Sequence, residues 1–136
     1  MHIHKKIAHC DASFDEENKT AIIGFILYDE EGALLSKKSI GHKGILNSFH
    51  AELLGIETAL RIFKNQHYYE CCLITDVKHI VTKVNEGGKI KGKVEYRAFY
   101  NDYVKKLRKM KNEMKCELMW VNRKKNKEAD KLTKKN

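Results

Sequence analysis

Apolar and polar positions near the start of the chain follow a pattern typical of strands. Residues 5–11, about 20–28 and about 33–40 each form such a run, and Asp29–Gly32 supplies a turn between the second and third. Strands joined by a short turn pair antiparallel. The chain is therefore expected to open with three antiparallel strands.

The period changes to a helical one over about residues 48–64. Apolar residues recur there on one side of a helix, at Phe49, Leu53, Ile56, Leu60 and Phe63. Glu52 falls on the neighbouring row, so we expect its side chain to face the protein rather than solvent. Glu57 and Arg61 are predicted to point elsewhere. The apolar side of this helix needs a sheet to cover it.

The second half of the chain alternates strands and helices. The predicted elements are a strand at 71–75, a helix at 76–86, a flexible basic loop at 87–93, an amphipathic helix at about 95–111, a strand at 116–121 and a short helix at 126–135. Together the patterns predict a single α/β domain over 1–136. It would contain a five-stranded mixed sheet, with three antiparallel strands first and helices on both faces.

Four acidic residues stand in contexts that are unusual for surface charge. Asp11 and Asp76 each end a predicted strand, Glu52 lies on the inner side of a helix, and Asp130 lies on the last short helix. Placing the fourth strand beside the first brings Asp11 and Asp76 together. Gathered carboxylates repel one another, and a cation with oxygen ligands keeps them ionised. The sequence therefore predicts a divalent-metal site.

The charge balance favours a polyanionic partner. The 136 residues contain 27 Lys and Arg against 18 Asp and Glu, a formal net charge of +9, which favours nucleic acid over a membrane surface. Lysines concentrate near the predicted acidic site, at positions 89, 91, 93, 124, 125, 127, 131, 134 and 135. They are either solvated faces or phosphate contacts, and their concentration beside the site favours phosphate contacts.

The cysteines and the hydropathy indicate the compartment. Cys10, Cys71, Cys72 and Cys116 fall inside predicted strands without metal-ligand spacing, which favours buried free thiols in a reducing cytosol over zinc ligands or disulfides. No apolar run approaches the roughly 20 residues of a membrane span. We expect a soluble, cytoplasmic and monomeric protein.

Five short motifs are spread along the chain in a defined order. They are Asp11-Ala12-Ser13, Ala51–Gly55, Ile74-Thr75-Asp76, Trp120-Val121 and Asn126–Leu132. In order and spacing the chain resembles ribonuclease H, type 1, over nearly its whole length. The resemblance implies a two-metal endonuclease that hydrolyses the RNA strand of RNA/DNA hybrids. It implies two magnesium ions, with manganese as the alternative, held by Asp11 as bridging ligand and by Glu52, Asp76 and Asp130.

The same resemblance suggests residues beside the substrate. These are Ala12, Ser13, Ser48, Asn126, Lys89, Lys91 and Lys93. Asn126 lies one helical turn before Asp130, and a role as helix N-cap is an open alternative for it. Trp120 is predicted to be a core anchor rather than a base-stacking platform. His50 is predicted to face solvent rather than substrate.

The chain departs from the family pattern at three places. No histidine follows His79, although family members often carry one in the loop that is Asn122–Lys125 here. Val77 replaces the usual serine, and Ser48–His50 replace asparagines that read RNA hydroxyls. We therefore expect a slower enzyme with looser hybrid specificity, and manganese should compensate better than magnesium.

Two alternatives stay open at this point. One is a non-catalytic or vestigial member that binds duplexes, although such a binder gains nothing from burying acids beside a phosphate backbone. The other is a different nuclease of the same fold. An exonuclease of the proofreading type expects Asp-x-Glu on the first strand, and Ser13 stands at that position.

Overall fold

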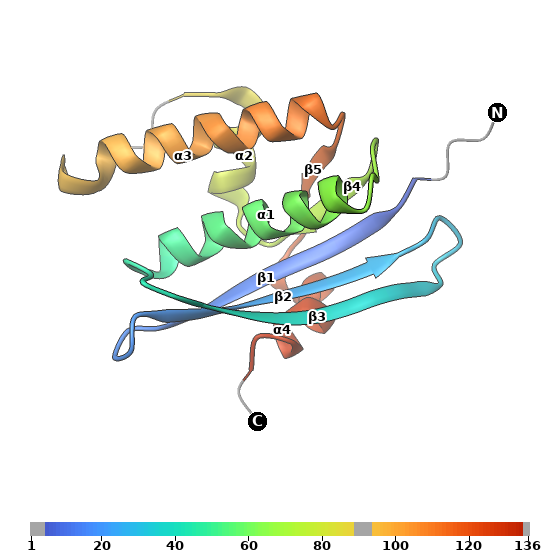
Figure 1. The fold of residues 1–136 in the computed structure, drawn as a ribbon, viewed down its shortest axis with the longest axis horizontal. Coiled ribbons are helices and arrows are strands. Elements are labelled where there is room, and N and C mark those ends of the chain that lie inside the picture. The colour runs from blue at the N-terminus through green and yellow to red at the C-terminus, as the bar shows by residue number, and fades with distance from the viewer. Residues whose placement is uncertain (1–4, 89–93, 135–136) are drawn as a thin grey trace.

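A computed structural model describes residues 5–88 and 94–134 of the chain. Its strands are β1 (Ile7–Asp15), β2 (Thr20–Tyr28), β3 (Leu34–Lys43), β4 (Cys72–Thr75) and β5 (Glu117–Trp120). Its helices are α1 (Ser48–Asn65), α2 (Lys78–Glu86), α3 (Val94–Glu113), the short 3-10 helix η1 (Arg123–Asn126) and α4 (Lys127–Lys131). The order and type of the predicted strands and of the first three helices are confirmed, with bounds that differ by a few residues (Figure 1). The last predicted helix, 126–135, is shorter and ends at Lys131, and most of the predicted loop at 87–93 lies outside the described residues.

The five strands form one mixed sheet in the order β3-β2-β1-β4-β5. The first three strands pair antiparallel, with Ile7 opposite Tyr28 at one end of the β1–β2 ladder and Asp15 opposite Thr20 at the other. β4 is parallel to β1, and β5 is parallel to β4. The predicted fold class, with three antiparallel strands first, is confirmed.

β1 extends further than the sequence predicted, and this moves Asp11. The strand runs to Asp15 because its second half still pairs with β2, so Asp11 lies in the middle of β1 rather than at its end. β4, the neighbour on the other side, stops at Thr75. Asp11 therefore lies where β1 loses one of its two neighbours, and this leaves room beside it.

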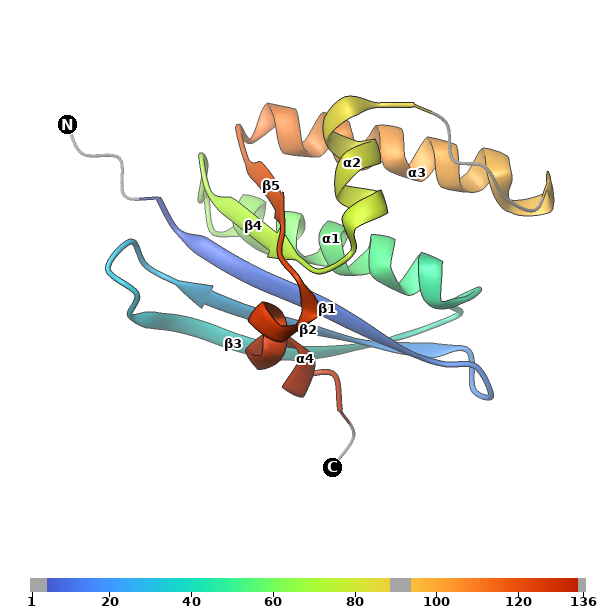
Figure 2. The same cartoon turned by 180° about the vertical axis from the view of Figure 1, so that it is seen from behind.

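Helices cover both faces of the sheet, as predicted. α1 lies on one face and α3 packs beyond it, while α4 lies on the opposite face against β1 and β2 (Figures 1 and 2). The core between α1 and the sheet contains the predicted stripe, with Leu53, Ile56, Leu60 and Phe63 at most 1% exposed. Among the described helices, none combines the length and the apolar character that a membrane span requires.

All four cysteines are free and buried, which confirms that prediction. Burial raises the pKa of the Cys10 thiol far above its ordinary value, and it raises that of Cys116 to about 12. Thiols in this state are protonated and act as small apolar side chains.

Gly24 allows α4 to sit directly on the sheet. A Cβ at this position of β2 would lie 2.2 Å from the carbonyl oxygen of Ala129 and 3.0 Å from Cβ of Leu132. Real Cβ atoms essentially never come as close as the first of these distances, so glycine permits this approach of helix to strand. The position of α4, and with it that of Asp130, depends on the lack of a Cβ atom at Gly24.

The prediction that Glu57 points away from the protein is wrong. Its side chain is 8% exposed and lies 2.7 Å from Nη2 of Arg61 and 2.6 Å from Nζ of Lys106, and it also accepts a hydrogen bond from the Tyr103 hydroxyl. Burial alone would raise the pKa of Glu57, but these donors outweigh it and lower the pKa to about 2. The helical period of α1 did not reveal that α3 would cover this side.

Candidate active site

The strand register places Asp11 beside Asp76. Ile7 pairs with Cys72 and His9 with Ile74, an offset of 65 residues that puts position 76 next to position 11. The same offset sets Cys10 beside Thr75, the residues just before the two acids. The predicted convergence of Asp11 and Asp76 therefore follows from the parallel pairing of β1 and β4.

Asp130 reaches the same place from the opposite face of the sheet. Its side chain shares a hydrogen bond with Asp11. It also lies 3.5 Å from Nζ of Lys134 and 4.0 Å from Nη2 of Arg123. The hydrogen bond with Asp11 and the two cations lower the pKa of Asp130, against an opposing effect of burial. A hydrogen bond between two carboxyl groups requires one proton, which Asp11 and Asp130 share.

Two of the four carboxyl groups are held against ionisation. Burial raises the pKa of Asp11 to about 7, and the charge of Asp76 and the hydrogen bond to Asp130 add to this effect. Burial and the charge of Asp76 also raise the pKa of Glu52 to about 7, while the nearby Arg123 opposes the rise. The four acids are therefore one electrostatic unit, in which Asp76 contributes repulsion to both neighbours.

The donor chemistry of this unit fits magnesium or manganese, since hard divalent cations prefer carboxylate oxygens. A cation could replace the proton that Asp11 and Asp130 share. Over the described ranges, however, no three or more His, Cys, Asp and Glu side chains gather closely enough to hold one metal ion. Asp130 is instead paired with Arg123 and Lys134. Joint coordination by all four acids stays a prediction.

Asn126 is a structural residue that ties the last segment to β1. It is 1% exposed, its Nδ2 donates to the carbonyl oxygen of Cys10 at 2.9 Å, and its Oδ1 lies 3.0 Å from Nδ1 of His9. Asn126 stands at the N-cap position of α4, as the alternative proposed, but its side chain makes no capping hydrogen bond there. The predicted substrate contact is not available to a side chain that is buried in this way.

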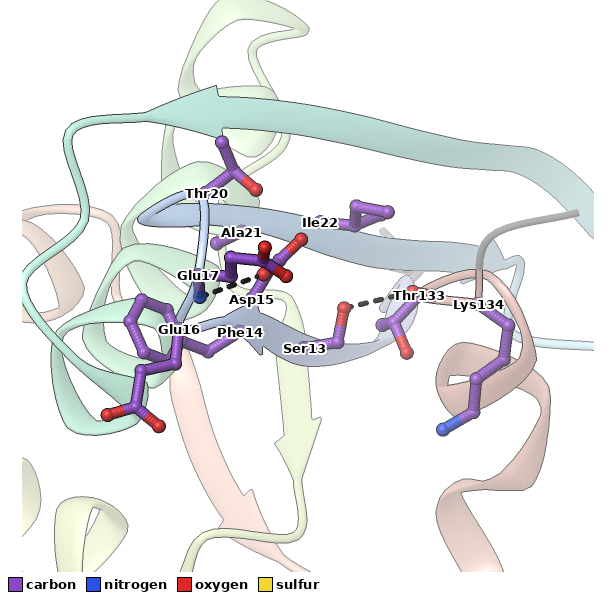
Figure 3. Close-up of a pocket in the computed structure, with 10 residues that line it drawn as sticks. All are labelled: Ser13, Phe14, Asp15, Glu16, Glu17, Thr20, Ala21, Ile22, Thr133 and Lys134. Atoms are coloured by element: carbon purple, nitrogen blue, oxygen red, sulfur yellow. Dashed lines mark hydrogen bonds between the residues drawn. The ribbon is translucent and has the colours of Figure 1, made fainter.

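Ser13 and Ala12 lie just beyond Asp11 on β1. The Ser13 hydroxyl donates to the carbonyl oxygen of Thr133 at 2.9 Å, at one side of a hollow of about 500 Å³ (Figure 3). Ala12 packs against a small apolar cluster on the α1 side of the sheet. The hollow is also lined by acidic side chains at positions 15, 16 and 17, so it suits a polyanion poorly. Substrate contacts by Ala12 and Ser13 stay predictions.

The start of α1 holds a residue that the sequence reasoning missed. Asn47 is the N-cap, its Oδ1 accepts from the backbone N–H of His50 at 2.9 Å, and its amide also donates to the Tyr100 hydroxyl. The preference of asparagine for N-caps was the available signal. Ser48 follows on the exposed surface, where a substrate contact stays a prediction.

The prediction that His50 faces solvent is wrong, because its ring is half-buried. Its Nδ1 accepts from the backbone N–H of Leu46 at 3.0 Å, and its ring lies edge-on to Phe99 at 5.2 Å between centroids. Burial lowers the pKa of His50, and the charge of Glu57 opposes this shift. The ring is a half-buried contact between α1 and α3.

Trp120 is also placed differently from the prediction. It is 42% exposed rather than buried in the core. Its indole N–H donates to the carbonyl oxygen of Asp76 at 3.2 Å, and Nζ of Lys78 lies 5.2 Å from its ring centroid. Trp120 is the last residue of an edge strand, where one neighbouring strand is missing. The core-anchor prediction is therefore wrong.

Lysines near the acids gather around a second hollow, on the α4 face. This hollow, of about 320 Å³, is lined by His9, Tyr28, Lys124, Lys125, Lys127 and Glu128. Three ammonium groups around one concave surface favour an anion of phosphate size. The predicted contacts of Lys89, Lys91 and Lys93 lie outside the described residues.

Comparison with known proteins agrees with this architecture. LC11-RNase H1, isolated from compost by a metagenomic approach, superposes with a TM-score of 0.77 at 22% identity, covering 96% of this chain and 93% of that one. Its complex with an RNA/DNA hybrid gives a TM-score of 0.76 at 22% identity, covering 94% and 93%. The N-terminal RNase H domain of rv2228c from Mycobacterium tuberculosis gives 0.78 at 17% identity, covering 96% and 91%. No curated protein sequence matches the chain.

The sheet order and the helices that cover it are those of the ribonuclease H-like fold. The sequence profile of the reverse transcriptase-like family matches residues 9–136, nearly the whole chain, so the chain belongs to that family. The resemblance to ribonuclease H, type 1, is thereby confirmed.

Proposed function

We propose that the protein is a metal-dependent endonuclease that hydrolyses the RNA strand of RNA/DNA hybrids. The observation that carries the proposal is the parallel register of β1 and β4, which sets Asp76 beside Asp11. Burial and the charge of Asp76 raise the pKa values of Asp11 and Glu52 to about 7. Structural relatives support the proposal, since one of them is solved with an RNA/DNA hybrid. A domain that only binds duplexes has no use for buried acids beside phosphates.

In this proposal Asp11, Glu52, Asp76 and Asp130 are the catalytic and metal-binding residues. Two magnesium ions, or manganese in their place, would supply charge stabilisation and an activated water when bound. The chain itself would orient the acids: the β1–β4 register positions Asp11 against Asp76, and the Gly24 contact positions α4 with Asp130. Arg123 would neutralise part of the charge that Glu52 and Asp130 bring together.

Substrate binding would rest mainly on the phosphate backbone. The hollow lined by Lys124, Lys125 and Lys127 and the basic segment with Lys89, Lys91 and Lys93 would hold phosphates, which gives affinity without sequence information. Distinction of RNA from DNA would come from 2′-hydroxyl groups and the hybrid shape. The buried free thiols fit a cytoplasmic location, and we propose a monomer.

A substrate panel tests the proposal. Labelled RNA/DNA hybrid, duplex RNA, duplex DNA and single strands would each be incubated with magnesium, manganese or EDTA. The proposal expects internal cuts in the RNA of the hybrid only, and only with a divalent cation. Binding of the hybrid without any cut in either metal would instead identify the non-catalytic alternative. Cuts confined to strand ends would identify an exonuclease.

A further inference from the structure

An exposed tryptophan borders the candidate active site, and the proposed chemistry does not use it. Trp120 is 42% exposed at the carboxyl end of β5, and its indole N–H donates to the carbonyl oxygen of Asp76. That hydrogen bond fixes the ring against the residue that carries one of the four acids. A large aromatic ring that is half open to solvent at such a place offers an apolar face beside a polar site.

The surroundings of Trp120 are positively charged. Lys78, an exposed residue at the start of α2, holds its Nζ 5.2 Å from the centre of the indole ring. Arg123, three residues after Trp120, has a side chain that is 77% exposed. An aromatic face with ammonium and guanidinium groups around it is complementary to a nucleotide, since the base stacks on the ring and the phosphate meets the cations.

Bases inside a duplex already stack on neighbours above and below, so they have no free face for an indole ring. A nucleotide of a single-stranded extension has such a face, and stacking on an aromatic side chain replaces the neighbour that it lacks. The hydrogen bond from the Trp120 indole to the backbone of Asp76 places this contact at the border of the candidate site.

From these contacts we infer that Trp120 and Lys78 form a binding site for an unpaired nucleotide, so that the protein prefers hybrids which adjoin a single-stranded segment. This inference rests on the proposed function for where the hybrid lies. It adds a substrate preference, for junctions between hybrid and single strand over continuous hybrid, which the four acids do not provide. Trp120 and Lys78 are binding residues here and take no part in the chemistry.

Trp120 is the chain's single tryptophan, so indole fluorescence, excited at a wavelength that the six tyrosines do not absorb, reports this site alone. The full chain in EDTA would be titrated with a long blunt hybrid and with the same hybrid carrying a single-stranded extension of either strand. We expect quenching of the fluorescence by an extended hybrid, together with roughly tenfold tighter binding than to the blunt one. Equal quenching and equal affinity for blunt and extended hybrids would overturn the inference.

Variants separate stacking from structure, with anisotropy of labelled nucleic acid as the readout. Trp120→Ala should abolish the preference for the extended hybrid and leave affinity for the blunt one unchanged. Trp120→Phe keeps an aromatic ring, so it should retain most of the preference for the extended hybrid. Met119→Ala is the matched control, because Met119 is 47% exposed on the same strand and alternates to the other face. An unchanged preference in Trp120→Ala would overturn the inference.

Failure of the proposed function would look different. Neither titration depends on turnover, so a protein that cuts no hybrid could still show the preference for extensions. The converse result is cleavage of continuous hybrid by the unaltered protein, together with an affinity for extended hybrid that Trp120→Ala does not change. That result would support the proposed function and contradict the nucleotide site at Trp120.

Discussion

The side-chain amide of Asn126 donates to the carbonyl oxygen of Cys10 at 2.9 Å, directly before Asp11, and Asn126 itself stands four residues before Asp130. One buried hydrogen bond thus connects the segments that carry two of the four acids. The oxygen of the same side-chain amide, Oδ1 of Asn126, lies 3.0 Å from Nδ1 of His9. Asn126 fixes the relative position of β1 and α4 near the candidate site.

Replacement of Asn126 by alanine should therefore affect both stability and turnover. It leaves the buried carbonyl oxygen of Cys10 and the half-buried ring of His9 without this hydrogen bond, and each group that stays unsatisfied costs about 1–3 kcal/mol. We expect Asn126→Ala to lower the free energy of unfolding by at least about 2 kcal/mol and to reduce hybrid cleavage more than tenfold.

Urea unfolding and initial cleavage rates measure these effects. The control is Asn122→Ala, since Asn122 is exposed and its side chain only caps η1 by accepting from Lys125. This variant should lose about 1 kcal/mol or less. Equal effects of the two substitutions would show that the Asn126 contact has no special role.

Gly24→Ala should displace α4 from the sheet. The added methyl group would meet the carbonyl oxygen of Ala129 at 2.2 Å, and backbone cannot give way as a flexible side chain does. We expect a loss of about 1–3 kcal/mol in stability and a larger fractional loss of cleavage, because Asp130 moves with the helix. The matched control is Gly55→Ala on α1, where the nearest atoms would lie 3.7 Å away. That variant should keep cleavage and gain up to about 1 kcal/mol.

The raised pKa values of Asp11 and Glu52 predict a pH-dependent effect of metal on stability. A carboxyl group with a folded pKa of about 7 and an unfolded pKa near 4 stabilises the folded state fully below about pH 4. This contribution is lost as the pH rises through about 7. A cation that replaces the protons should therefore stabilise the protein more at high pH than at low pH.

Thermal unfolding near pH 5 and near pH 8, with EDTA or with excess magnesium, measures this. We expect magnesium to raise Tm by roughly 5–10 °C near pH 8 and much less near pH 5. In EDTA near pH 8, Asp11→Asn should unfold at a higher temperature than the unaltered protein, because it removes a repelled charge. A magnesium effect of the same size at both pH values would contradict the assignment of these two acids as a cation site.

The lysines should control the salt dependence of hybrid binding. Neutralising Lys124, Lys125 and Lys127, or separately Lys89, Lys91 and Lys93, should flatten the log-log slope of affinity against salt by roughly one unit per lost phosphate contact. The control neutralises three lysines at or just beyond the carboxyl ends of α1 and α3, at positions 64, 109 and 115. If all three triple variants change the slope alike, the lysines act through net charge and the α4-face hollow is no phosphate site.

The sequence predicted the parts of the site that depend on local pattern and strand order. Asp11 and Asp76 could be brought together because both follow apolar strand residues and a parallel pairing aligns them. The roles of Glu57 and Trp120 could not be predicted in this way. Glu57 is buried by residues from α3, and Trp120 is exposed because it ends an edge strand, so both depend on contacts between elements far apart in the sequence.

Cleavage of a labelled RNA/DNA hybrid by the unaltered protein and by Asp11→Asn tests the central claim most directly. Asp11 meets both Asp76 and Asp130, so removing its charge should abolish metal-dependent cleavage, by a factor of about 10³ or more, while circular dichroism shows an unchanged fold. The account predicts internal RNA cuts with magnesium or manganese, no cuts in EDTA, and none by the variant. Undiminished cleavage by folded Asp11→Asn protein would contradict it.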